Sequence, residues 1–293
     1  MGRVTVVAEI GSNFDQSYDR ALRLIEAAAQ AGADAVKTQV FRAEWLAHPS
    51  HPAYETLRQN ELPRYWLPKL AQHARDCGIR LAGTPFDLEA VRLLDELDVP
   101  FIKIASGDLT YRPLIRAAAQ TGRPLVISTG GATEQEIAAA VRAVTETLRD
   151  DGRLEEGETP PVVFLHCTVA YPCEAKDANL GKLRERLSDR RWKGGPDWGF
   201  SDHTLSVTLP AVAVGMGAVM VEKHLTLSRG NSGPDHGHSL EPGEFAQMVR
   251  AIRETEGAAD PHNTWTGPLP VERGVLPLAR RGCYEPWDEV TRE

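Results

Sequence analysis

Two histidines stand beside carboxylates at the ends of strand-like segments, a pattern that can hold a metal ion. His203 lies in residues 199–204 (GFSDHT) and His224 lies in residues 219–224 (VMVEKH). If these segments are neighbouring strands of a barrel, both imidazoles reach one mouth, where a divalent metal can bind and still accept a substrate oxygen. A single histidine is more often a hydrogen-bonded structural residue, but a pair at equivalent places on consecutive strands favours a metal site.

These histidines belong to a chain in which short β-branched runs alternate with helical patterns. The strand-like runs occupy residues 4–10, 35–40, 80–84, 101–106, 125–129, 162–167, 198–201 and 219–224. The helical patterns occupy residues 18–31, 66–77, 88–97, 113–121, 134–148, 180–187, 207–215 and 243–256. This alternation predicts a parallel sheet. Eight such units in about 250 residues predict an α/β fold of the (β/α)8 TIM barrel type.

The main alternative fold is a doubly wound open sheet, which normally carries a glycine-rich phosphate loop after its first strand. The corresponding residues 10–14 read IGSNF and do not fit that loop. We therefore expect a single barrel domain over residues 1–257 and a short, irregular, proline-rich C-terminal tail over residues 258–293. Residues 42–64 form a long loop after the second strand, which predicts an active-site cover or a disordered insertion.

The composition excludes several classes of protein. The formal net charge of the 293 residues is -8, so no basic surplus exists to neutralise nucleic-acid phosphates. No apolar run approaches the roughly 20 residues that cross a bilayer. The four cysteines form no C-x-x-C pair, and the first strand begins near the N-terminus with no signal peptide before it. Together these features predict a cytoplasmic protein with reduced thiols.

Polar side chains collect at the C-terminal ends of the predicted strands, the face on which barrel enzymes place their sites. Lys37 and Lys103 lie within otherwise apolar strands, where a lysine is costly unless it points into a polar, ligand-filled space. With neighbouring hydroxyls they predict a cradle for a phosphate or a carboxylate. The predicted cradle comprises Lys37, Lys103, Thr84, Ser106 and Ser128, with Gln39 on the same strand face as Lys37. The alternative, internal ion pairs of the lysines with Glu9 and Glu222, stays open, and both can hold at once.

A turn-rich loop follows the last predicted strand and reads GPDHGHSL over residues 233–240. On a barrel this loop overhangs the pair of histidines. His236 is a candidate for a further metal ligand, although a histidine in a loop is more often only a polar contact. His166, near the end of the sixth strand, can equally be a structural residue.

The motifs at the strand ends, taken together and in order, resemble those of the sialic acid synthase family. They read AEIG at 8–11, KTQ at 37–39, TPF at 84–86, KIASGD at 103–108, STG at 128–130, HCT at 166–168, SDHT at 201–204, EKH at 222–224 and GPDH at 233–236. No single motif is specific, but nine in register make the resemblance strong. It implies a barrel enzyme that condenses phosphoenolpyruvate (PEP) with the open-chain aldehyde of an N-acylated amino sugar, giving a nonulosonic acid and phosphate.

The resemblance also implies roles for single residues. It assigns a divalent cation, Mn²⁺ or Mg²⁺, to His203 and His224, and a sugar contact to Asp235. The residues that it assigns to PEP are Lys37, Thr84, Lys103, Ser106, Ser128 and Tyr171. In this chemistry the metal activates the aldehyde oxygen, water traps the carbon at C2, and phosphate leaves. A carboxylate orients or deprotonates the water, and Glu9 and Asp15 are the candidates for that role.

The sequence departs from the family mainly on the sugar side. Asp15 stands where many members carry a glutamate thought to act in the water step, within a segment, residues 14–16, that reads FDQ. Val169 replaces a common asparagine or serine. The sequence also stops before the antifreeze-like domain that most bacterial members append. We therefore expect a condensing enzyme whose acceptor need not be N-acetylmannosamine.

Two alternatives to this function stay open. A metal-dependent barrel aldolase, lyase or isomerase on a small anionic substrate would use the same lysines, and an isomerase would release no phosphate. A non-catalytic relative that binds a sugar or PEP is the second, although the retention of both metal histidines and both lysines counts against it. A homodimer is expected in either case, because symmetric dimers are the commonest oligomers.

Overall fold

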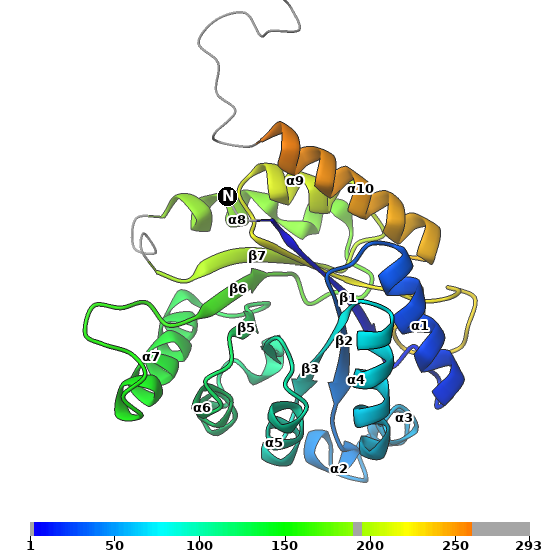
Figure 1. Cartoon of the computed structure of the whole chain (residues 1–293), viewed down its shortest axis with the longest axis horizontal. Helices are drawn as coiled ribbons and strands as arrows, with labels where there is room; N and C mark the ends of the chain where they lie inside the picture. Colours follow the sequence, from blue (N-terminus) through cyan, green and yellow to red (C-terminus); the bar gives the residue numbers. More distant parts are fainter. Residues whose placement is uncertain (1–2, 190–194, 260–293) are drawn as a thin grey trace, which may run out of the picture. The chain divides into compact units, whose positions relative to one another are not determined.

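Eight parallel strands form a closed barrel in sequence order, with β8 paired to β1. Figure 1 shows helices packed around the strands. This is a computed structural model, and it describes residues 3–189 and 195–259. The strands are β1 (Thr5–Gly11), β2 (Ala35–Val40), β3 (Arg80–Pro85), β4 (Ile102–Ile104), β5 (Leu125–Ser128), β6 (Val162–His166), β7 (Asp197–Asp202) and β8 (Met220–His224). The predicted (β/α)8 barrel is confirmed. The predicted tail lies almost entirely outside the described residues.

Helices follow the strands and bury an apolar stripe against the outside of the barrel. They are α1 (Tyr18–Gln30), α4 (Leu67–Asp76), α5 (Leu88–Glu96), α6 (Arg112–Gln120), α7 (Glu134–Asp150), α8 (Leu180–Ser188), α9 (Leu209–Gly215) and α10 (Pro242–Ala258). Their starts follow local chemistry: Thr133 and Glu136 form a capping box at α7, and Asp87 caps α5 by accepting from the backbone of Ala90. Within the described part of the chain, no helix is long and apolar enough to cross a membrane.

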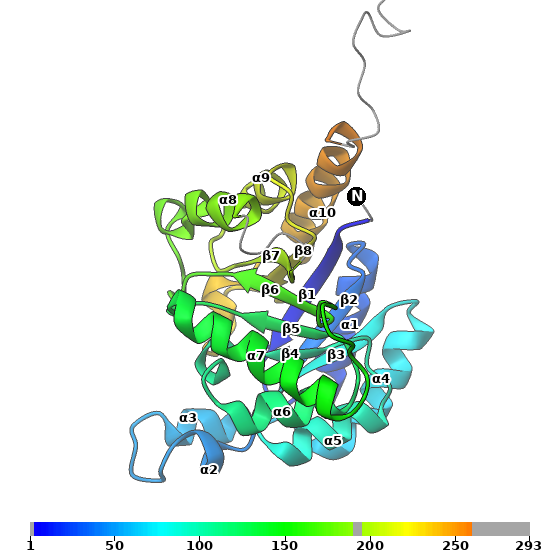
Figure 2. The same cartoon turned by 90° about the vertical axis from the view of Figure 1, so that its left-hand side faces the viewer.

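The long segment between β2 and β3 is ordered rather than structureless. It contains two short helices, α2 (Ala43–Leu46) and α3 (Tyr54–Gln59), and a 3-10 turn at Arg64–Trp66. Figure 2 shows α2 and α3 at the edge of the barrel. Trp45 and Leu46 of this segment line a groove that shares Phe86 with the central cavity described below.

Side chains alternate along each strand between the barrel interior and the surrounding helices. One apolar layer inside the barrel is formed by Val7, Ala35, Ala82, Phe101, Val126, Leu165 and Met220. Gly199 completes this layer on β7, where an added Cβ would lie 2.5 Å from the carbonyl oxygen of Met220 and 2.7 Å from Leu165. The interior is therefore packed below the mouth, and polar residues two positions further along the strands rest on an apolar floor.

Candidate active site

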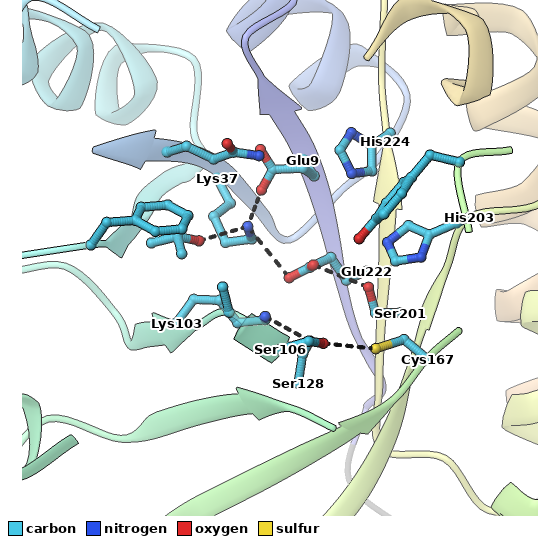
Figure 3. Close-up of a pocket in the computed structure, with 15 residues that line it drawn as sticks. Glu9, Lys37, Lys103, Ser106, Ser128, Cys167, Ser201, His203, Glu222 and His224 are labelled. Carbon is cyan, nitrogen blue, oxygen red and sulfur yellow. Dashed lines mark hydrogen bonds and ion pairs between the residues drawn. The ribbon is translucent and has the colours of Figure 1, made fainter. Parts of the chain in front are cut away.

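A cavity lies above this floor, at the C-terminal mouth of the barrel (Figure 3). Every strand, or the loop directly after it, contributes to its lining, which comprises Glu9, Lys37, Gln39, Thr84, Phe86, Lys103, Ala105, Ser106, Ser128, Cys167, Tyr171, Ser201, His203, Glu222 and His224. Eight of these stand two residues after a member of the apolar layer or after Gly199: Glu9, Lys37, Thr84, Lys103, Ser128, Cys167, Ser201 and Glu222. The period of the strands therefore places them on one inner level.

The cavity brings together ten of the residues predicted for the site. They are Glu9, Lys37, Gln39, Thr84, Lys103, Ser106, Ser128, Tyr171, His203 and His224. Asp15 and Asp235 are not in the lining. Sequence reasoning did not place Cys167 or Ser201 in the site, because small uncharged side chains give no signal of their own. The period of two would have found Ser201, two residues before His203.

Lys37 forms the centre of a buried group of charges. Its Nζ donates to Oε2 of Glu9 and, over 2.9 Å, to Oγ1 of Thr84. Oε2 of Glu222 lies 3.7 Å away from the same nitrogen. The internal ion pair that the sequence left open is thus present for Lys37, inside the same cavity that would receive an anion.

The pKa values of the two carboxylates around Lys37 are shifted in opposite directions. Burial raises the pKa of Glu9 to about 7, although Lys37 opposes this shift. Burial also acts to raise the pKa of Glu222, but the charges of Lys103 and Lys37 outweigh it and lower that pKa below the ordinary value. Glu222 is therefore the ionised partner, while Glu9 can take up or release a proton near neutral pH, as a general acid or base must.

Lys103 has neutral partners. Its Nζ donates to Oγ of Ser128 over 2.7 Å and to the backbone carbonyl of Ile104 over 3.1 Å. Burial lowers its pKa from the ordinary lysine value. Ser106 is held nearby, since its Oγ accepts from the backbone N–H of Gly130 over 3.1 Å. A cation and hydroxyls that face the same cavity are suited to hold a phosphate or a carboxylate.

His203 and His224 lie together at the rim of the cavity, with ring centres 5.7 Å apart. His203 Nδ1 is 2.8 Å from the backbone carbonyl of Thr168, so this nitrogen is the donor and Nε2 keeps its lone pair. Burial lowers the pKa of both rings, which favours the neutral, metal-binding form. The ring of Tyr171 packs on His203 at 4.4 Å between centres.

A third histidine, His238, joins this pair from the loop after β8. Its ring centre is 4.6 Å from that of His224 and 6.4 Å from that of His203. One ligand atom from each of His224, Asp235 and His238 lies within 4.8 Å of the other two. Sequence reasoning considered His236 in this loop and gave His238 no role.

The donor atoms present fit a divalent metal ion. Among the described residues, His224 Nδ1 and His238 Nε2 are buried nitrogens without a hydrogen-bond partner, a costly condition that a bound cation would relieve. Imidazole nitrogens with a carboxylate are a donor set used for Mn²⁺, Fe²⁺ and Zn²⁺. The cluster therefore supports a metal site at the rim, without identifying the metal.

Asp15 and His236 are bound to each other outside the cavity. Asp15 Oδ1 lies 2.9 Å from His236 Nε2, and Asp15 also pairs with Arg20. His236 Nδ1 is 2.7 Å from Oγ1 of Thr226. These contacts connect the β1–α1 turn to the loop after β8, so both residues are placed to hold loops rather than to face the cavity.

Asp235 and His166 are also fixed by protein contacts. Asp235 Oδ2 accepts from Oγ and the backbone N–H of Ser12, over 3.0 and 3.2 Å. His166 contacts the carbonyl of Ala178 at 3.1 Å and Arg186 at 3.3 Å. Since His166 is absent from the cavity lining, its structural interpretation is the one that the contacts support.

The sequence of this barrel is similar to one protein family and to several known proteins. The model of the NeuB family matches residues 24–263. The chain is 35% identical to N,N'-diacetyllegionaminic acid synthase of Legionella pneumophila, over 86% of this chain and 72% of that protein. It is 34% identical to N-acetylneuraminate-9-phosphate synthase of Mus musculus, over 86% of this chain and 70% of that protein.

A solved structure agrees with the sequence relatives. N-acetylneuraminic acid synthetase of Leptospira borgpetersenii, in complex with citrate, superposes with a TM-score of 0.82 and 28% identity, covering 97% of this chain and 94% of that one. A family match over most of the chain, relatives above 30% identity and the same barrel together decide the assignment: the chain belongs to the NeuB family.

Proposed function

We propose that this protein is a PEP-dependent condensing synthase. It joins PEP to the aldehyde of a sugar or amino sugar, giving a nonulosonic acid and phosphate with the help of a divalent metal. The observation that carries the proposal is the convergence of two buried lysines, a carboxyl group with a pKa of about 7 and a rim of neutral imidazoles in one cavity of a NeuB-family barrel.

The lysine side of the cavity would bind PEP. Lys103 with Ser128, and Lys37 with Thr84, present ammonium groups and hydroxyls at hydrogen-bonding distance of each other. These groups would hold the phosphate and carboxylate of PEP, and would stabilise the charge that develops as phosphate departs. Ser106, Gln39 and Tyr171 line the same cavity.

The histidine side would bind the acceptor aldehyde. His203 and His224 would hold Mn²⁺ or Mg²⁺, which would supply Lewis-acid polarisation of the aldehyde oxygen. The methylene carbon of PEP then forms a bond to the aldehyde carbon, the aldehyde oxygen takes a proton, and water adds to C2 and gives up one proton to a base. The tetrahedral intermediate breaks its bond to the phosphate oxygen, so that a 2-keto acid and inorganic phosphate result.

The water step needs a base within reach of C2. Glu9 lines the cavity, and its two oxygens accept from Lys37 and from the backbone N–H of Gly11. Its raised pKa suits proton transfer near pH 7. Asp15 stays a second prediction for this role, and its contacts with Arg20 and His236 favour a structural contribution instead. A cytoplasmic homodimer likewise stays a prediction.

The test is release of inorganic phosphate from PEP with Mn²⁺, measured against a panel of amino sugars, aldoses and other aldehydes, with an EDTA control. We expect metal-dependent release with one acceptor class and formation of a 2-keto acid in equal amount. No release with any aldehyde, or turnover of a small anion without phosphate, would replace the proposal with the lyase, isomerase or binding alternatives.

A further inference from the structure

We propose that His238 is a third imidazole ligand of the rim metal, and that with Asp235 it makes the site selective for a nitrogen-preferring transition metal over Mg²⁺. This inference rests on the proposed function, which places a divalent metal at His203 and His224. It adds His238 as a ligand, a residue to which neither the strand pattern nor the resemblance gave a role.

The position of His238 is imposed by the path of the loop. Leu240 pairs beside Leu225, and its backbone N–H donates to the carbonyl of His224 over 2.9 Å. The hydroxyl of Ser239 donates to the carbonyl of Asp235 over 2.6 Å. These bonds return the chain along the end of β8 and fix the 3-10 turn His236–His238 directly beside His224.

The side chain of His238 is buried and incompletely satisfied. Only 3% of the residue is exposed, and its Nε2 has no hydrogen-bond partner among the residues that the structure describes. Nδ1 of His224 is in the same condition. Buried polar atoms nearly always have a hydrogen-bond partner. Two imidazole nitrogens without one, on side chains that are neighbours in space, therefore point to a shared ligand.

The spacing of the rings fits one metal ion. An imidazole bound at about 2.1 Å has its ring centre roughly 3.2 Å from the metal, so two bound rings have centres about 4.5 to 6.4 Å apart. The three observed separations, among His203, His224 and His238, are 4.6, 5.7 and 6.4 Å. These separations between ring centres allow three rings around one ion, and the ligand atoms that already lie within 4.8 Å of one another are those of His224, Asp235 and His238.

Asp235 supplies a carboxylate oxygen close to His238. Its Oδ2 is held by Ser12, and its Oδ1 lies 3.9 Å from Nε2 of His238. The compact group of candidate ligands consists of His224, Asp235 and His238, and the ring centre of His203 lies 5.7 Å from that of His224. Three imidazoles and a carboxylate favour Fe²⁺, Co²⁺ or Zn²⁺, whereas Mg²⁺ prefers oxygen and retains its waters.

The experiment titrates the metal-free protein with Co²⁺ in the absence of PEP and acceptor, following visible absorption and heat. His238→Ala and the size-conserving His238→Gln are compared with wild type. His73→Asn on the outer helix α4, which contacts Glu26, is the matched control. We expect both His238 variants to lose about tenfold or more in Co²⁺ affinity and to change the absorption bands, with Mg²⁺ binding unaffected and the control unchanged.

Two results would overturn the inference. One is a Co²⁺ spectrum and affinity in both His238 variants equal to wild type, and the other is equal affinity of the wild type for Mg²⁺ and Co²⁺. Because no substrate is present, these outcomes are independent of the phosphate-release assay. A protein that binds Co²⁺ through His238 yet releases no phosphate would keep this inference and remove the proposed function.

Discussion

At the scale of single residues, the two buried lysines of the cavity have unequal tasks. Lys37 forms ion pairs with Glu9 and Glu222, whereas Lys103 acts on Glu222 only through its charge and makes its hydrogen bonds to a hydroxyl and a backbone carbonyl. The charge of Lys37 is thus already balanced within the fold. We expect an incoming anion to depend more strongly on Lys103.

The variant Lys103→Met should raise the KM for PEP about 100-fold, because a hydrogen bond to a charged group contributes about 1.5–3 kcal/mol. Steady-state phosphate release measures this effect. Lys176→Met, at a side chain 74% exposed, is the control and should leave KM unchanged. An increase of less than about threefold in the Lys103 variant would assign the anion to other groups.

At the scale of elements, successive side chains of β8 face opposite sides of the barrel wall, and the two sides have different functions. Glu222 and His224 point into the cavity, while Lys223 between them points outward and pairs with Asp202 of β7. Both of these side chains are fully buried. The pair connects β7, which leads directly into His203, with β8, which carries His224. The contact on the outer face therefore stabilises the positions of the two histidines.

Removing one partner of this buried pair should be costly. We expect Lys223→Met to lower the free energy of unfolding by about 3–5 kcal/mol, because Asp202 keeps a buried, uncompensated charge. Urea unfolding measures the change. The double variant with Asp202→Asn should recover much of the loss, and Arg92→Met, in the exposed pair with Glu96, should cost under about 1 kcal/mol. A double variant no more stable than the single one would contradict this account.

Two loops are connected by Asp15 and His236, and this link gives a test of the role of Asp15. If Asp15 acts by holding the loop, Asp15→Ala should lower kcat/KM for the acceptor about tenfold and leave the KM for PEP unchanged. Asp15→Asn, which keeps a side chain that can bond His236, should recover most of that activity. Equal and severe loss in both variants, as expected for Glu9→Gln, would instead make Asp15 the base of the water step.

At the scale of the whole molecule, the site depends on closure of the barrel. Each strand supplies a cavity residue directly or through its following loop, so the groups converge only when β8 pairs with β1. A ligand that touches several of these strands should therefore stabilise the barrel as one unit. Binding to the native state alone stabilises by mass action.

PEP at about 100 times its Kd should stabilise the protein by about 2.7 kcal/mol, which raises the Tm of a chain of this size by roughly 5–10 °C. Thermal unfolding with and without PEP and Mn²⁺ measures the shift. The same shift should be largely lost in Lys103→Met. A wild-type Tm unaffected by millimolar PEP would mean that the cavity does not bind it.

Much of the fold could be predicted because it follows from local patterns. Alternation of β-branched runs with helical periodicity gave the strands in their places, and the period of two put Lys37 with Gln39, and Glu222 with His224, on shared faces. The lysines were recognisable because a charge in an apolar strand needs a polar destination. The long segment at residues 42–64 was harder, since its short helices carry little periodicity.

The sequence by itself thus determined the barrel, the polar side chains that face its interior at the mouth, and the two histidines at the ends of neighbouring strands. Only the tertiary structure decided which side chains are partners. Lys37 pairs with a carboxylate, whereas Lys103 forms no ion pair with a carboxylate within the described residues. Asp15 binds His236, and His238 stands beside His224. The reason is physical. Periodicity fixes the face on which a strand residue lies, but a loop has no period, and its side chains are placed by long-range contacts.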